Sequence, residues 1–174
     1  MIAMRTLVLF LALAAFTVDA ATFEGLVLNW PEQEGWKVAN RQENKNIQML
    51  ELVREGETLE NWTQIGTMIW NKGAVLPHID KAYALYSSKL RAGCPGAQIN
   101  TVLLEADIPF PRVIFTLDCP KTPKDGHPES AVWLIVQGKQ SLYVAHRAAR
   151  TERLSENLQK KWASWLKSAK VMER

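Results

Sequence analysis

Two runs of alternating residues, separated by a short polar connector, constrain the fold of this chain more than any other stretch. They cover residues 47–54 and 63–70, and the connector between them covers residues 55–61. Alternation with a period of two predicts strands, because successive side chains of a strand point to opposite faces. Neither run contains the apolar stripe of a helix. We therefore expect a strand pair to which the rest of the chain adds further strands and two helices.

The same alternation predicts two hairpins beside this pair. Residues 36–42 lead through a polar turn into residues 47–54, which favours an antiparallel hairpin. Farther along, a two-residue turn with Gly138 first would pair Trp133 with Val144. Both faces of this second hairpin are apolar, which predicts a central place in the sheet with cover on both sides. Residues 98–106 and 112–119 are expected to add two more strands.

Two segments have the apolar period of a helix. The first begins near Pro77 and ends at Gly93, and the second begins at about Ser155. With 174 residues, of which 47% are apolar, the chain can fill one core. The order of elements predicts an α+β fold, a mostly antiparallel sheet covered by helices, in a single domain of residues 21–174.

The first residues have the pattern of a secretory signal peptide. Arg5 precedes a short apolar run, and small residues up to Ala20 suit cleavage before Ala21. The apolar run is too short for a membrane anchor, which needs about 20 such residues. We expect residues 1–20 to be removed and the mature protein to be periplasmic or secreted, with no integral membrane segment.

The two cysteines of the chain, Cys94 and Cys119, are each followed by a proline. In an exported protein such a pair predicts a disulfide bond. A catalytic thiol is the alternative, but no neighbouring histidine or Cys-x-x-Cys spacing is present to activate it. The bridge would connect the end of the first helix to the end of strand 112–119.

Charge and motif patterns exclude several classes of function. The net charge is only +3, and the basic residues are scattered, so we expect no nucleic-acid binding. The three histidines are not spaced as zinc ligands, and no serine lies in a G-x-S-x-G motif. We therefore predict no catalytic residue, no metal site and no cofactor.

Four residues are candidates for binding. Trp30, Trp36 and Trp62 lie beside turns, where aromatic side chains can line a groove or a protein-binding patch, although core packing is the alternative. His146 continues an apolar face of the last hairpin, and a hydrogen-bonded histidine at the sheet edge is its structural alternative.

Short motifs give two resemblances. With Pro31, Gly35 and Trp36, the hairpin that follows them, and a last strand leading into an amphipathic helix, the chain resembles the PsbP/Mog1-like α/β/α sandwich. Residues 55–64 and 92–97 resemble uncharacterised small exported proteins of Gram-negative bacteria. Both resemblances imply a binding or assembly role rather than catalysis, and neither identifies functional residues.

Three hypotheses of function follow. The first is an exported periplasmic binding or accessory protein that acts through a protein partner, for example as an inhibitor or immunity protein. The second is a small periplasmic hydrolase that uses His146, which requires a pocket at this residue and an acidic group within hydrogen-bond reach. The third is an apolar-ligand carrier, which requires a cavity of several hundred Å³ between sheet and helix.

Overall fold

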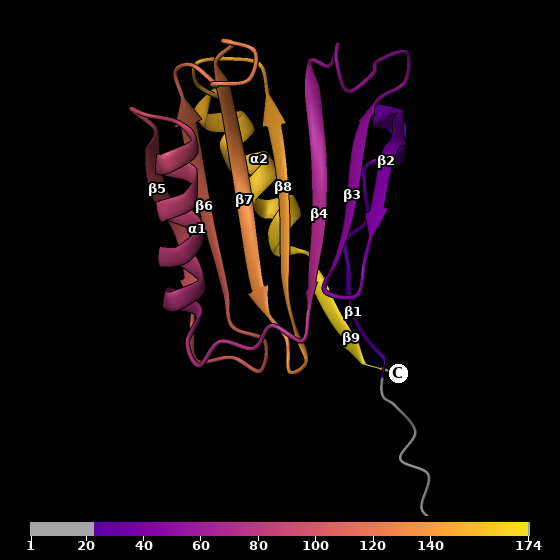
Figure 1. The fold of residues 1–174 in the computed structure, drawn as a ribbon, viewed down its shortest axis with the longest axis vertical. Helices are drawn as coiled ribbons and strands as arrows, with labels where there is room; N and C mark the ends of the chain where they lie inside the picture. Colours follow the sequence, from indigo (N-terminus) through magenta and orange to yellow (C-terminus); the bar gives the residue numbers. More distant parts are fainter. Residues whose placement is uncertain (1–22, 174) are drawn as a thin grey trace, which may run out of the picture.

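The computed structural model describes residues 23–173, so the predicted signal peptide lies outside the described residues. Seven antiparallel strands form one large sheet in the order β2-β3-β4-β8-β7-β6-β5, and β1 and β9 form a separate two-stranded ribbon. Figure 1 shows this ribbon beside the lower end of the large sheet. The two ends of the described chain therefore lie together.

The bounds of the elements follow the turns of the sequence closely. The large sheet contains β2 (Trp36–Glu43), β3 (Ile47–Arg54), β4 (Gln64–Lys72), β5 (Gln98–Glu105), β6 (Arg112–Cys119), β7 (Glu129–Gln137) and β8 (Ser141–Ala149). The ribbon consists of β1 (Glu24–Val27) and β9 (Lys170–Glu173). The helices are α1 (Ile79–Gly93), α2 (Glu156–Lys167) and the single 3-10 turn η1 (Glu32–Glu34). The predicted hairpin of β2 and β3 is confirmed.

The prediction of a PsbP/Mog1-like α/β/α sandwich, with a sheet covered by helices, is wrong. The described residues form nine strands in two antiparallel sheets, whereas α1 has 15 residues and α2 has 12, so the fold is mostly β. Helix α1 lies mainly on β6 and β7, and α2 lies behind them and reaches β8 (Figure 1). A helix about 10–12 Å wide spans about two strands that are about 4.8 Å apart. One helix on each face therefore cannot cover seven strands, and among the described residues α1 and α2 pack mainly on β6, β7 and β8 rather than on β2 and β3.

The central hairpin of β7 and β8 separates two apolar cores. On one face Trp133 and Ile135 pack with Phe115 of β6 and with α1, and on the other Leu134 and Val136 pack with α2. The predicted central place and double apolar face of this hairpin are confirmed.

The predicted register of this hairpin is wrong by two residues. Trp133 pairs with His146 rather than with Val144, and Lys139 and Gln140 occupy the turn. The cause lies in β1, because the Glu24 carboxylate accepts hydrogen bonds from the backbone N–H groups of these two turn residues, at 2.7 and 3.2 Å. A shift of two residues keeps every side chain on its predicted face.

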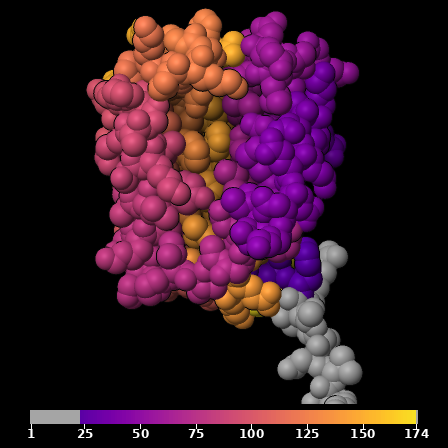
Figure 2. All heavy atoms as spheres, viewed as in Figure 1, coloured from indigo at the N-terminus to yellow at the C-terminus, as the bar shows by residue number. Residues whose placement is uncertain are grey.

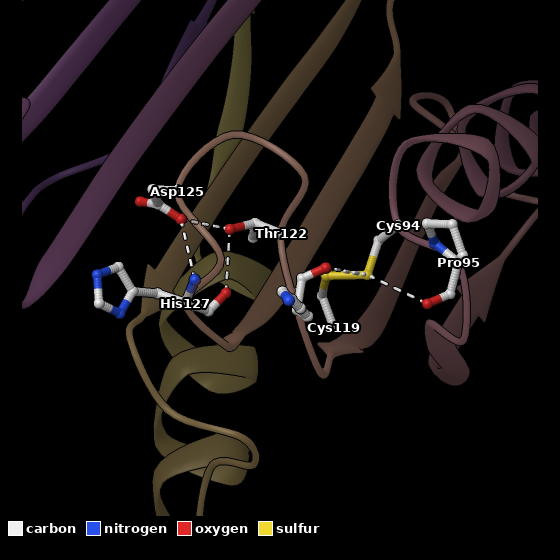
Figure 3. The surroundings of a disulfide bond; sticks show 7 residues. Cys94, Pro95, Cys119, Thr122, Asp125 and His127 are labelled. Carbon is white, nitrogen blue, oxygen red and sulfur yellow. Dashed lines mark hydrogen bonds between the residues drawn. A yellow bond between two sulfur atoms is a disulfide. The ribbon is translucent and has the colours of Figure 1, made fainter.

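The predicted disulfide bond between Cys94 and Cys119 is confirmed. Cys94 follows the last residue of α1 and Cys119 ends β6, and their Cα atoms are 6.0 Å apart. Figure 3 shows the bridge beside a loop in which the Asp125 carboxylate accepts hydrogen bonds from Thr122 and from the backbone N–H of His127. The bridge connects α1 to the strand beneath it.

Candidate functional site

An apolar pocket of about 340 Å³ opens between the β1–β9 ribbon and the large sheet. It lies on the sheet face that also carries α2, because its sheet residues Met68, Trp70 and Tyr143 belong to the α2 core. The ribbon side of the pocket is formed by Phe23, Leu26, Val27 and Met172, and the sheet side is completed by Gln48 and Leu50.

Apolar side chains remain exposed along the ribbon side of this pocket. Phe23 is 58% exposed, Val27 is 47% exposed and Met172 is 44% exposed. Phe23 also packs edge-on against Trp70, with ring centroids 5.7 Å apart. The four-residue strands of the ribbon are too short to bury these side chains, so the pocket has an apolar rim.

Trp30 lies beside one end of the pocket. Its ring lies against Gly66 of β4, where any side chain would collide with it, and its indole N–H donates to the sulfur of Met68 at 3.4 Å. Met68 lines the pocket and Trp165 of α2 lies 4.6 Å from Trp30, so Trp30 lies between this lining residue and α2. The absence of a side chain at Gly66 is what allows this approach.

The polar groups of the pocket are few. The Tyr143 hydroxyl donates to the Glu24 carboxylate at 3.1 Å. Burial, reinforced by the neighbouring Glu24 charge, raises the pKa of Tyr143 well above its usual value. Tyr143 is therefore neutral at physiological pH, and its hydroxyl hydrogen is already donated to Glu24. The Gln48 amide is the other polar side chain of the lining.

His146 is buried on the opposite face of the sheet. Its ring stacks on Trp133, with centroids 3.9 Å apart and planes 19° from parallel. Its Nδ1 atom has no hydrogen-bond partner within residues 23–173, and no carboxylate there is bonded to it. Burial lowers the pKa of His146 to about 3, so the ring is neutral at neutral pH. The geometry required of a catalytic His146 is therefore not met.

Buried neutral His146 should make the protein sensitive to acid. Its pKa is 6.5 when unfolded and about 3 when folded, so the unfolded state binds the extra proton and stability falls below about pH 6.5. Between about pH 7.5 and about pH 4.5 this residue alone should reduce the free energy of unfolding by about 2–3 kcal/mol. Urea unfolding of wild-type protein and His146→Phe at both pH values measures the difference.

The matched control for this prediction is His127→Phe. His127 lies in the exposed loop before β7, so its replacement should leave the acid sensitivity of wild-type protein unchanged. Equal acid sensitivity of His146→Phe and wild-type protein would contradict the prediction. Carboxylates contribute to acid unfolding in all three proteins, and the comparison removes their contribution.

None of the four residues predicted to bind lines the apolar pocket. Trp30 and Trp36 lie together, with ring centroids 5.0 Å apart, and Trp165 of α2 lies 4.6 Å from Trp30. Trp62 lies apart from them under the Arg150 guanidinium, at 4.7 Å from the ring centroid. All three predicted tryptophans are half-buried. They pack against other side chains and form no shared groove with His146.

Trp36 belongs to a cluster of charged and aromatic side chains around Arg147. The Arg147 guanidinium lies 4.9 Å from the Trp36 ring and 4.4 Å from the Trp162 ring, and it donates to Glu34 at 2.5 Å. Burial raises the pKa of Glu34, but the hydrogen bond and charge of Arg147 outweigh it and lower the pKa overall. Arg147, Arg54 and Lys161 all form ion pairs with Glu34, so this cluster holds η1, β8 and α2 together.

A second depression, of about 370 Å³, has a more polar lining and lies near the N-terminus of α2. Its buried carboxylate, Asp118, accepts hydrogen bonds from Ser130 at 2.5 Å and from Arg153 at 3.3 Å. No histidine lines this depression. Ser130 and Asp118 are therefore hydrogen-bonded to each other, and no histidine of the described residues is present here to complete a catalytic triad with them.

Figure 2 shows the face that carries α1. It is hollowed between the rose atoms of α1 and the purple atoms of β2 and β3, and orange to yellow atoms form its floor.

In the part of the chain that the structure describes, no group of three or more His, Cys, Asp or Glu residues is placed to hold a metal ion. No helix within residues 23–173 is long and apolar enough to cross a membrane.

Comparison with known proteins finds no match to any family and no similar curated protein. The PsbP/Mog1 resemblance therefore has no support from sequence similarity.

The sequence pattern indicates the sheet side of the pocket but not its ribbon side. Alternation places Met68 and Trp70 on one face of β4, and the register with β3 sets Leu50 and Gln48 beside them. The pattern does not show that the chain ends, through β1 and β9, form the other side. Strands of four residues carry too little alternation to be recognised.

Proposed function

We propose that this protein is an exported binding protein that holds a small apolar ligand in the pocket between the β1–β9 ribbon and the large sheet. The observation that carries this proposal is the pocket itself, about 340 Å³ with a mainly apolar lining. Sites for small molecules are commonly concave, apolar and about 300–1,000 Å³ in volume. Exposed apolar side chains at the rim are a further mark of a binding surface.

The proposed location outside the cytoplasm is supported by two features. The sequence before Ala21 has the pattern of a signal peptide, and the only two cysteines are joined in a disulfide bond. Disulfide bonds persist in oxidising compartments such as the bacterial periplasm.

Among the three hypotheses, the pocket favours the apolar-ligand carrier. The expected cavity lay between sheet and helix, whereas this one lies between the sheet and a ribbon of two strands. A protein partner, including the inhibitor or immunity form of that hypothesis, is less well supported because stable protein interfaces bury about 800 Å² on each partner. The exposed apolar residues of the ribbon, Phe23, Val27 and Met172, instead line a pocket of small-molecule size.

Binding of the neutral dye N-phenylnaphthylamine tests the proposal. Wild-type protein should bind the dye with increased fluorescence, and Leu50→Arg should weaken binding about tenfold or more, because a charge in the apolar lining is costly to desolvate. Fluorescence titration of purified protein, with thermal unfolding as a check of folding, gives both results.

Leu85→Arg is the matched control. Leu85 is 45% exposed and lies on α1, which packs on the opposite face of the sheet, so this change should leave dye affinity unchanged. If wild-type protein does not bind the dye, or if Leu50→Arg binds it equally well, the proposal fails and a protein partner becomes the better hypothesis.

A further inference from the structure

We propose that the ligand is a single-chain amphiphile with a carboxylate head, whose head lies at the Gln48 and Lys72 end of the pocket. This inference rests on the proposed function, since it names the ligand class of the same pocket. Three observations carry it: the polar groups gather at one end, that end has a cation with spare donor capacity, and the other end is apolar.

The polar end is formed by neighbouring residues of β3 and β4. Gln48 pairs with Trp70 in the register of these strands, and both side chains line the pocket. Within residues 23–173 the Gln48 side-chain amide has no hydrogen-bond partner, whereas the indole N–H of Trp70 is fully buried and does not face the pocket. A free amide in an apolar lining favours a ligand that offers it hydrogen bonds. The Gln48 amide can donate to a carboxylate.

Lys72 supplies positive charge at the same end. Its Nζ atom lies 5.4 Å from the centroid of the Trp70 ring. It donates to Glu43 at 2.6 Å and to the backbone carbonyl of Asn44 at 3.3 Å. An ammonium group has three N–H donors, so one remains for a ligand. The exposed Arg41 lies two residues before Glu43 on β2, and its positive charge also acts on the Glu43 carboxylate.

Glu43 is the negative charge that competes with a ligand carboxylate. The hydrogen bond and charge of Lys72 lower the pKa of Glu43, so this side chain is ionised at neutral pH. Lys72 and Arg41 both act on Glu43, so these three side chains together carry one net positive charge. The Glu24 carboxylate accepts hydrogen bonds from the Tyr143 hydroxyl and from two backbone N–H groups, which occupy its oxygens without neutralising its charge.

The opposite end of the pocket accepts only an apolar group. Leu50 and Met68 line it, and Trp30 lies beyond Met68 with its indole N–H directed at the sulfur. A volume of about 340 Å³ is at the lower end of the range for small-molecule sites. One short alkyl chain therefore suits the pocket better than the two chains of a membrane lipid.

Isothermal titration calorimetry with decanoate, decanol and decyltrimethylammonium tests the head group at constant chain length. The protein used is the form purified after export from the producing cell. Decanoate should bind roughly fivefold or more tightly than decanol, and decyltrimethylammonium should bind most weakly, because charge-assisted hydrogen bonds are stronger than neutral ones. Lys72→Met should reduce decanoate affinity to that of decanol and leave decanol binding unchanged, which also shows that the variant is folded.

Two further variants make the test specific. Lys89→Met removes the same charge from α1, on the other face of the sheet, and should leave all affinities unchanged. Glu43→Gln removes the competing carboxylate and should raise decanoate affinity roughly twofold or more, a gain that a purely structural role for Lys72 would not produce.

The possible outcomes separate this inference from the proposed function. Equal binding of all three amphiphiles would overturn the carboxylate assignment while the apolar-ligand function stands. Tightest binding of decyltrimethylammonium would also overturn it. Failure of all three to bind would overturn both the inference and the proposed function.

Discussion

Replacing Cys94 and Cys119 together with alanine should lower the free energy of unfolding by about 3–4 kcal/mol. The bridge closes a loop with a sequence separation of 25 residues, and a crosslink of this length removes a corresponding amount of chain entropy from the unfolded state. Both cysteines are buried, so the bridge also holds the end of α1 against β6. Urea unfolding of the exported double variant and of wild-type protein measures the difference.

Wild-type protein unfolded in the presence of a reductant is the control. Its free energy of unfolding should fall to that of the double variant, because both then lack the crosslink. A loss below about 1 kcal/mol in the double variant would contradict the prediction, since it would mean that the bridge hardly restricts the unfolded chain. Mass measurement after alkylation should find no free thiol in the unreduced wild-type protein.

Glu34→Ala should lower the free energy of unfolding by about 3 kcal/mol. Its carboxylate pairs with Arg147, whose side chain is only 3% exposed, so the substitution leaves a buried guanidinium without its counter-charge. Glu34 also forms ion pairs with Arg54 at 3.2 Å and with Lys161 at 3.3 Å. Urea unfolding at neutral pH gives the magnitude.

Two comparisons show whether the unpaired charge is the cause. Glu32→Ala removes an exposed carboxylate from the same 3-10 turn and should change stability by less than about 0.5 kcal/mol. The double variant Glu34→Ala, Arg147→Met should recover part of the loss, because no buried charge then remains unpaired. A double variant that is less stable by the sum of both single losses would contradict this explanation.

Local elements of the fold were predictable where the information lies within a few residues. The alternation in residues 47–54 corresponds to β3, and the apolar stripe after Ser155 corresponds to α2. Ser155 begins α2 because its side chain accepts a hydrogen bond from the backbone N–H of Leu158 at 3.3 Å. Such patterns depend on neighbouring residues alone, so they can be read without the rest of the structure.

The β7–β8 register was not predictable in the same way. Gly138 is a favourable first residue of a two-residue turn, yet the turn falls one residue later because Glu24 binds the backbone of Lys139 and Gln140. Glu24 is more than a hundred residues away in sequence. A distant carboxylate of this kind leaves no local signal in the turn.

The candidate site was predictable only in part. The sheet side of the pocket follows from the alternation that gathers Met68 and Trp70 on one face of β4. The choice of Trp30 and Trp36 as binding residues relied on their positions beside turns, but Trp165 and Arg147 pack against them from α2 and β8. Those contacts depend on how distant elements meet, which the turns do not specify.

The sequence by itself determined the seven strands of the large sheet, the two helices, the apolar character of both faces of the central hairpin, and the pairing of its only two cysteines. Tertiary structure alone decided what lies on each face. The two helices cover the sheet around β6 and β7, and β1 and β9, at the two ends of the described residues, form the ribbon opposite β3 and β4. The physical reason is that side-chain periodicity shows which face of an element is apolar but not which distant element buries it. The pocket exists because the ribbon covers that apolar face only partly.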